Sequence, residues 1–146
     1  MSVADIAPQI CRGIGRHFRA LGHATLAEFS LPDGRRADVF AVDDKGGISI
    51  IEIKSCLIDF RTDQKWQDYL DWCDRFYFAV TVDFPREALP AEPGLIVADA
   101  YGAEVLRPAP GSALLAAARR RSLLLRFAAK AANRLARLED PEGFEP

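Results

Sequence analysis

The sequence predicts an α/β protein with a mixed central sheet flanked by helices, and three observations lead to that prediction. The chain has 146 residues, of which 49% are hydrophobic and 27% are charged, as in one compact globular domain. Its apolar periodicity alternates between helical and extended in the order α-β-β-β-α-β, followed by a short hairpin and a long helix. Two central strands are apolar on both faces, which is typical of strands covered on both sides.

The first half of the chain predicts one helix and three strands. Apolar side chains recur at helical spacing over residues 4–22. The segment Leu31-Pro32-Asp33-Gly34 has turn chemistry, because proline presets one turn residue and glycine accepts the left-handed conformation. A second polar turn covers residues 43–47. Strands are therefore expected over residues 24–31, 35–42 and 48–54.

The second half predicts one further helix, a strand, a hairpin and a long terminal helix. The pattern is helical, with many charges and aromatic rings, over about residues 58–72, and strongly apolar over 76–82. A proline-rich connection then leads to a hairpin around Tyr101-Gly102. The expected bounds are 84–93 for the connection, 95–100 and 103–106 for the hairpin strands, and 112–138 for the terminal helix.

Charge divides the chain into three parts. Residues 1–111 carry 12 basic and 17 acidic side chains, whereas residues 112–138 carry 7 basic and no acidic ones. The last segment, 139–146, has a net charge of −4. We expect a core over 1–111, a basic amphipathic helix packed on that same domain, and an acidic tail. Because the whole chain has a formal charge of only −2, a polyanion would meet a local basic face.

Several functional classes find no support in the sequence. Cys11, Cys56 and Cys73 are widely spaced and form no Cys-x-x-Cys motif, so neither a disulfide framework nor a zinc knuckle is predicted. There is no secretory signal pattern and no run of 18 apolar residues. Serine-hydrolase and nucleotide-binding motifs are also missing. The sequence predicts a cytoplasmic protein with no membrane partner.

Three carboxylates are expected to lie in a row across the first three strands. If residues 43–47 form a five-residue loop, Asp38 lies opposite Glu52. If the preceding turn has three residues, Glu28 lies opposite Asp38. Directly opposed Cβ atoms are about 4.5–5.5 Å apart, and Lys54, two residues after Glu52, shares its face. A slip of one residue in register would destroy this alignment.

Such a row of charges favours a divalent cation. Two carboxylates about 5 Å apart repel by about 3 kcal/mol at an effective dielectric constant near 20. Carboxylates and a backbone carbonyl, here that of Ile53, are the oxygen ligands that Mg²⁺ (or Mn²⁺) accepts. Lys54 would lie beside the metal and position a water molecule, which suggests hydrolysis of a phosphodiester. The alternatives are a Glu52–Lys54 ion pair with a solvated Asp38, and an ordinary edge-strand role for Glu28.

These residues resemble a known superfamily. Asp38, followed by Ile-Glu52-Ile-Lys54 on the next strand, is similar to the motif of the PD-(D/E)XK nucleases, which have a restriction-endonuclease-like core. The residue before Asp38 is Ala37, where the motif has proline. In that superfamily the helix after the third strand often supplies auxiliary groups, and Lys65 and Tyr69 are spaced one α-helical turn apart here. The alternative for these two residues is a solvated helix face with an aromatic ring packed beneath it.

More narrowly, the chain resembles the MmcB-like proteins, which are linked to DNA repair. The resemblance rests on the runs Arg35-Arg36-Ala37-Asp38, Ile51-Glu52-Ile53-Lys54-Ser55, Asp59-Phe60-Arg61, Lys65-Trp66, Asp68-Tyr69 and residues 94–102. It implies a Mg²⁺-dependent deoxyribonuclease, a hydrolase of phosphodiester bonds. It also implies that Asp38 and Glu52 are metal ligands and that Lys54 is the catalytic lysine.

Basic side chains suggest where DNA would bind. At 100° per residue, five of the seven basic residues of the terminal helix fall within an arc of about 80°. Arg35 and Arg36, beside the first turn, are further candidates for phosphate contacts. The alternative is a solvated face neutralised by the acidic tail. The helix residues are Arg119, Arg126, Lys130, Arg134 and Arg137.

Two other functions remain open from the sequence. One is a DNA-binding module that keeps the nuclease fold without cleaving. The other is a partner-docking protein without DNA activity, in which the carboxylates form a satisfied polar network. The DNA structure preferred, the cleavage mode and the formation of a homodimer are also open.

Overall fold

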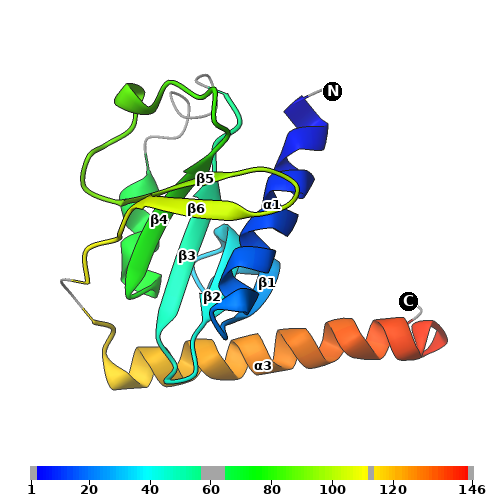
Figure 1. Ribbon diagram of the computed structural model, residues 1–146. Coiled ribbons are helices and arrows are strands. Elements are labelled where there is room, and N and C mark those ends of the chain that lie inside the picture. Colours follow the sequence, from blue (N-terminus) through cyan, green and yellow to red (C-terminus); the bar gives the residue numbers. More distant parts are fainter. Residues whose placement is uncertain (1–2, 57–64, 112–113, 145–146) are drawn as a thin grey trace. The chain divides into compact units, whose positions relative to one another are not determined.

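The structure is a computed structural model that describes residues 3–56, 65–111 and 114–144. It divides into two compact units, Met1–Leu115 and Ala116–Pro146, which are described separately. The first unit contains helix α1 (Val3–Ala20) and a mixed sheet (Figure 1). No helix in the described ranges is long and apolar enough to cross a membrane.

The described part of the first unit forms a six-stranded sheet in which the strands follow one another in chain order. The pairs β3–β4 and β4–β5 are parallel, and the other three neighbouring pairs are antiparallel. The predicted mixed sheet is therefore confirmed. The strands are β1 (Ala24–Ser30), β2 (Arg36–Val42), β3 (Ile48–Ile53), β4 (Arg75–Val80), β5 (Gly94–Ala98) and β6 (Ala103–Arg107).

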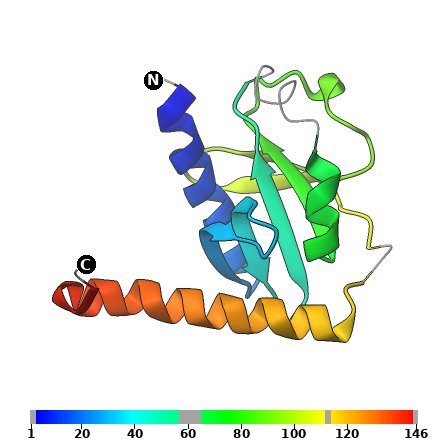
Figure 2. The ribbon, with the colours of Figure 1, turned by 180° about the vertical axis from the view of Figure 1, so that it is seen from behind.

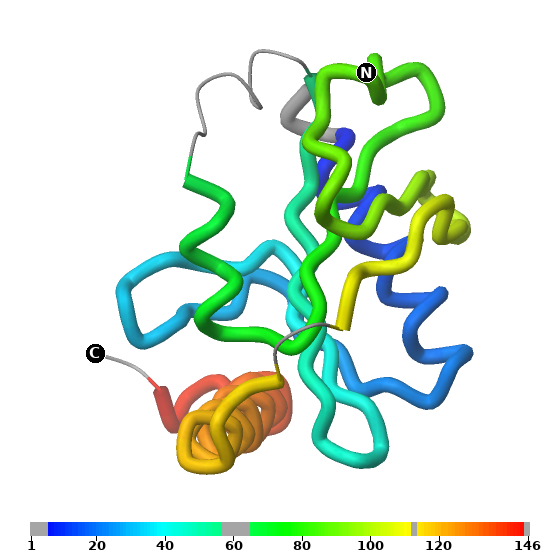
Figure 3. Tube along the Cα trace, turned by 90° about the vertical axis from the view of Figure 1, so that its left-hand side faces the viewer, coloured from blue at the N-terminus to red at the C-terminus, as the bar shows by residue number. Residues whose placement is uncertain are grey.

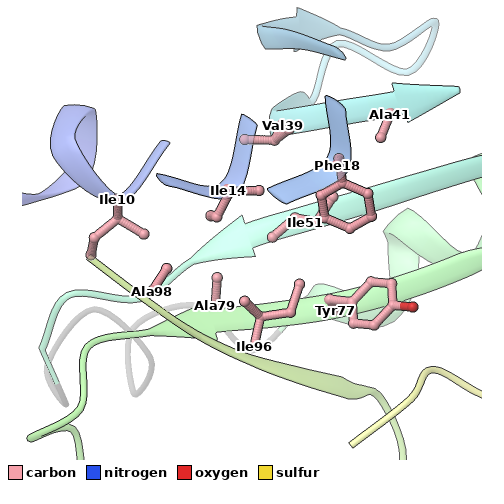
Figure 4. Packing of buried hydrophobic residues seen from close by; sticks show 10 residues of the cluster. All are labelled: Ile10, Ile14, Phe18, Val39, Ala41, Ile51, Tyr77, Ala79, Ile96 and Ala98. Carbon is pink, nitrogen blue, oxygen red and sulfur yellow. The ribbon is translucent and has the colours of Figure 1, made fainter. Parts of the chain in front are cut away.

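Helix α1 covers one face of this sheet. Ile10, Ile14 and Phe18 recur at helical spacing and point from the helix toward apolar side chains of four strands (Figure 4). Burial of this apolar stripe against the sheet stabilises the unit. The strand residues of the cluster are Val39, Ala41, Ile51, Tyr77, Ala79, Ile96 and Ala98.

Aromatic side chains cover the opposite face. The 3-10 helix η1 (Trp66–Trp72) lies in front of the sheet when the molecule is seen from behind (Figure 2). Figure 3 shows the sheet between η1 and α1. The Trp66 and Tyr69 rings stack on Phe76 of β4, with centroids 5.7 and 5.8 Å away. Trp66 is therefore a core residue.

The helix expected over residues 58–72 lies partly outside the described residues, and its described part is not an α-helix. Residues 57–64 lie outside the described residues, and the described remainder is a 3-10 helix rather than an α-helix. Short 3-10 segments are common connectors. Here the segment is held by stacking of Trp66 and Tyr69 on Phe76. The spacing of apolar residues in the sequence does not reveal such a contact with a distant strand. A second short 3-10 helix, η2 (Arg86–Ala88), lies in the proline-rich connection.

The register predicted from the two turns is confirmed. Leu31 N–H donates to the Arg35 carbonyl oxygen at 2.7 Å, and Ser30 pairs with Arg36. Gly34 has a φ of 91°, the left-handed conformation that the turn requires. Val42 pairs with Ile48, as a five-residue second loop demands.

The second unit consists of α3 (Ala117–Glu139) and the 3-10 helix η3 (Pro141–Phe144). Helix α3 begins five residues later than the expected residue 112. The Arg137 guanidinium lies over the Phe144 ring at 5.3 Å, so η3 folds back on the end of α3. Packing of α3 on the first unit remains a prediction.

Candidate active site

Asp38 and Glu52 lie together where β2 and β3 stop pairing. The last backbone pair is Val39 with Ile51, and one further step in register places Asp38 opposite Glu52. Beyond that pair, the two strands are joined by hydrogen bonds from backbone N–H groups to side-chain carboxylates instead of backbone–backbone hydrogen bonds. Asp38 N–H donates to Glu52 Oε1 at 3.0 Å, and Ile53 N–H donates to Asp38 Oδ2 at 2.8 Å. Each carboxylate is thus positioned by the other strand.

Lys54 follows directly after β3 and is held by β4. Its backbone N–H donates to the Ala79 carbonyl oxygen at 2.9 Å, which extends the parallel pairing by one residue. Alternation along the strand gives Lys54 the same face as Glu52. Glu52 is 5% exposed and Lys54 is 7% exposed, so both charged side chains are buried. Buried charges of this kind need compensating partners.

Burial dominates the ionisation of the carboxylate pair. Removal from water raises the pKa of Glu52 to about 9, and the charge of Asp38 adds to this rise. Burial also raises the pKa of Asp38, although the hydrogen bond from Ile53 opposes the rise. The Lys54 charge lowers the pKa of both carboxyls without cancelling these shifts. At neutral pH the pair holds a proton, for which a divalent cation would compete.

Glu28 does not complete a buried row of three carboxylates. The flanking pairs Ala27–Val39 and Phe29–Ala37 place its backbone opposite Asp38, as predicted. However, Glu28 has a φ of 51°, and its side chain is 68% exposed, with Oε1 4.0 Å from Arg36. Within the ranges described, no group of three His, Cys, Asp or Glu residues could hold a metal ion.

The positive φ of Glu28 has a visible effect on the strand. The Phe29 ring lies 4.1 Å from that of Phe40. Strict alternation from the Leu26–Phe40 pair would put Phe29 on the opposite face from Phe40. The local twist at Glu28 therefore moves Phe29 into the core and leaves the Glu28 carboxylate in solvent.

Lys65 and Tyr69 do not share one face of a helix. In a 3-10 helix residues four apart differ by about 120° around the axis, because each turn has three residues. Tyr69 is buried, and its hydroxyl donates to the Arg36 carbonyl oxygen at 3.3 Å. Lys65 is exposed before the first residue of η1. The structure thus brings the Tyr69 hydroxyl against β2 beside Asp38, and the auxiliary role of Lys65 remains a prediction.

Arg35 and Arg36 have different surroundings. The Arg35 guanidinium pairs with Asp33 at 3.2 Å and also with Asp68, so it joins the β1–β2 turn to η1. A phosphate would have to compete with both carboxylates for it. Arg36 is 62% exposed beside Glu28 and is the more accessible of the two.

The basic residues predicted on the terminal helix do lie on α3. Arg119 and Arg126 are exposed, and Lys130 and Arg134 are partly exposed. The helix carries no acidic residue in its first turn. Their role in DNA binding remains a prediction.

Cys11 is a neighbour of the site that sequence reasoning missed. Its Sγ lies 3.9 Å from the Asp38 carbonyl oxygen, across 27 residues of sequence. Burial raises the pKa of the Cys11 thiol, and the charges of Asp38 and Glu28 raise it further. The thiol therefore stays protonated. No local sequence signal could have placed it there, because the contact depends on how α1 crosses β2.

The donor set of the site suits a hard divalent cation. Asp38 and Glu52 supply carboxylate oxygens, and the carbonyl of Ile53 lies between Glu52 and Lys54 on the same strand. Mg²⁺ commonly takes one or two carboxylates and fills its other positions with water and substrate phosphate. A third protein carboxylate is not required for that coordination.

Comparisons with known proteins agree with the resemblance seen in the sequence. The family model described as DNA repair protein MmcB-like matches residues 2–142. The chain is also similar to a solved structure, the SPO1766 protein of unknown function from Silicibacter pomeroyi, with 50% sequence identity and a TM-score of 0.91. That similarity covers 95% of this chain and 94% of the other. A search of curated proteins found no match.

Proposed function

The chain belongs to the MmcB-like DNA repair protein family, and we propose that it is a metal-dependent nuclease that hydrolyses DNA phosphodiester bonds. The proposal includes a PD-(D/E)XK core. The observation that carries it is the pair of partly buried Asp38 and buried Glu52, each bound by a backbone N–H of the other's strand, with buried Lys54 two residues further on. Buried, strongly perturbed titratable groups are concentrated at functional sites.

Each residue of the site has a distinct proposed role. Asp38, Glu52 and the Ile53 carbonyl would hold Mg²⁺ or Mn²⁺, and Glu52 would lose its proton on binding. A bound divalent cation neutralises phosphate charge and lowers the pKa of water. Lys54 orients the attacking water and stabilises the charge that develops on the phosphate oxygens. Tyr69 acts as a positioning residue, since its hydroxyl fixes the Arg36 carbonyl before Asp38.

DNA would be held by cations outside this pair. Arg36 is the accessible arginine near Asp38, and α3 offers a basic stripe. Each phosphate contact of this kind makes binding more sensitive to salt. Arg35 is a weaker candidate, because Asp33 and Asp68 already hold its guanidinium.

The decisive experiment is a cleavage assay on linear, nicked, branched and single-stranded DNA with Mg²⁺, Mn²⁺ or EDTA. The variants are Lys54→Ala and Lys54→Met, the second of which keeps most of the side-chain volume. We expect a loss of at least about 100-fold in cleavage rate, comparable to removing one transition-state donor. Lys45→Ala is the matched control, because Lys45 is an exposed lysine of the β2–β3 turn.

The outcomes separate the functions considered. Cleavage that needs a divalent cation and Lys54, but not Lys45, supports the nuclease. DNA binding without cleavage of any substrate, equal in the wild type and in Glu52→Ala, would favour a non-cleaving module. Absence of DNA binding, together with a defined complex with another protein, would favour the partner-docking function.

A further inference from the structure

The exposed face of α1 carries three arginines that the proposed site does not use. Arg12, Arg16 and Arg19 are exposed, while Ile10, Ile14 and Phe18 of the same helix are buried. With 3.6 residues per turn, the three arginines lie within an arc of about 60° and span about 10 Å of helix. In the part of the chain that the structure describes, none of them has a carboxylate within 4.0 Å.

The turn between β5 and β6 is fixed against this helix. Figure 1 shows the loop between β5 and β6 beside α1. Arg12 Nε donates to the Ala100 carbonyl oxygen at 3.1 Å. A Cβ added at Gly13 would lie 1.9 Å from the Asp99 carbonyl oxygen, so only glycine permits this approach. The turn and the arginine row therefore form one rigid surface.

Tyr101 stands at the tip of that turn. It is 78% exposed, although its backbone is held by a hydrogen bond from its N–H to Asp99 Oδ1 at 2.8 Å. An exposed aromatic ring on a fixed backbone, next to a row of cations, is the combination with which proteins bind single-stranded nucleic acid.

A hollow of about 810 Å³ opens between the turn and α1. It is lined by Tyr101 together with Ile6, Gln9 and Val82, and by the acidic residues Asp99 and Glu104. These carboxylates would repel a phosphate, but they can accept hydrogen bonds from the amino groups of a base. The hollow therefore suits a base, while the arginine row suits the backbone that carries it.

We propose that this surface binds an unpaired nucleotide of a DNA strand, with Arg12, Arg16 and Arg19 on the phosphates and Tyr101 stacked on the base. The inference deepens the proposed function and rests on it, because it names the DNA structure that the carboxylate site acts on. Helix α1 also touches the strand that carries the proposed site: Cys11, next to Arg12, lies 3.9 Å from the Asp38 backbone carbonyl oxygen, while the Asp38 and Glu52 side chains lie on the opposite face of the sheet.

The test measures binding of the full chain to fluorescent DNA in EDTA, as a function of salt. The probes are a 15-nucleotide single strand and a blunt duplex of the same sequence. Arg16→Gln should reduce the slope of log affinity against log salt by about 0.7 on the single strand. Tyr101→Ala should weaken single-strand binding about tenfold without changing that slope, and should leave duplex binding unchanged. Tyr101→Phe should bind like the wild type.

Lys45→Gln is the control for general loss of charge, and it should change the slope less than Arg16→Gln does. The proposal is overturned if the wild type does not bind the single strand. It is also overturned if Tyr101→Ala weakens both probes equally, or if Arg16→Gln and Lys45→Gln behave alike. If cleavage requires Lys54 but is unchanged in the Tyr101 and Arg16 variants, the nuclease proposal is supported and the single-strand surface is rejected. If the variants show the expected binding pattern but the protein cleaves no DNA, the surface is supported and the nuclease proposal is rejected.

Discussion

Ile51 and Glu52 are neighbours on β3, both buried, yet they lie in opposite environments. Ile51 is fully buried in the apolar cluster beneath α1. Glu52 faces the other side of the sheet, beside Asp38 and Phe78. The first residue is buried for stability, whereas burial of the second costs stability because its charged form is desolvated. Two adjacent positions of similar exposure therefore serve opposite purposes.

This contrast shows where the sheet places its chemistry. Along β2 and β3 the paired residues from Val39 to Val42 are apolar or small, and so are their partners from Ile48 to Ile51. The charges begin one residue beyond the last pair. A strand end offers backbone N–H groups that are free of the ladder, and the carboxylates of Asp38 and Glu52 bind two of them. The apolar paired residues of β2 and β3 thus hold the charged residues at the strand ends in position.

The largest expected effect on stability is that of Ile51→Ala. Removal of a fully buried isoleucine side chain should lower the free energy of unfolding by about 2–5 kcal/mol, through lost burial and the cavity left behind. Urea denaturation followed by circular dichroism measures this. Val105→Ala is the control, because Val105 is a partly buried member of the same face and should cost less. A loss below about 1 kcal/mol would contradict the assignment of Ile51 to the core.

In contrast to Ile51→Ala, Glu52→Gln should raise the free energy of unfolding, by an amount that depends on pH. The pKa of Glu52 rises from 4.5 to about 9 on folding, so between these values the folded state binds more protons than the unfolded state. Wild-type stability should therefore fall as pH rises through that window, by up to about 1.4 kcal/mol per pH unit. The variant should be the more stable protein at pH 8 and should have a flatter profile between pH 5 and 8.

Asp44→Asn provides the control for this profile, because Asp44 is an exposed carboxylate of the β2–β3 turn and its loss should leave the pH dependence unchanged. Mg²⁺ sharpens the comparison. It should raise the melting temperature of the wild type more at pH 8 than at pH 6, and should have a smaller effect on Glu52→Gln. A wild-type profile that is flat, or that rises with pH, would refute the argument from burial.

The smallest effect is expected from Arg35→Gln. Its ion pairs with Asp33 and Asp68 are partly exposed, so their loss should lower the melting temperature only slightly. The cost should shrink in 0.5 M salt, because salt screens such pairs. Thermal unfolding at two salt concentrations measures it, with Arg86→Gln as an exposed control. A loss of stability as large as that of Ile51→Ala would mean that the ion pair with η1 matters far more than its exposure indicates.

Much of the site geometry could be predicted because loop lengths fix register. Counting outward from the two turns placed Asp38 opposite Glu52 with no knowledge of the fold, and the observed pairs agree. Side-chain alternation then gave Lys54 the face of Glu52. These are local inferences over about 20 residues, in which the chain has few alternatives.

The parts that could not be predicted depend on distant contacts or on backbone detail. Alternation assigns Glu28 to the carboxylate face, but a positive φ, which few residues other than glycine adopt, takes its side chain into solvent. The pairing of Arg35 with Asp68 joins residues 33 apart. The 3-10 geometry of η1 likewise follows from stacking on Phe76, which only the assembled sheet provides.

The chain-order arrangement of the sheet also has a consequence for folding. Because each strand pairs with the next one along the chain, the sheet can grow by one strand at a time at a single edge during synthesis. The two hydrogen bonds that join the carboxylate pair span only 14 and 15 residues, so closing that loop costs little entropy. The β2–β3 hairpin can thus bring Asp38 and Glu52 together before β4 has formed. The residues that pair with Glu52 and Ile53 on the other side, Phe78 and Ala79, arrive with the later strand.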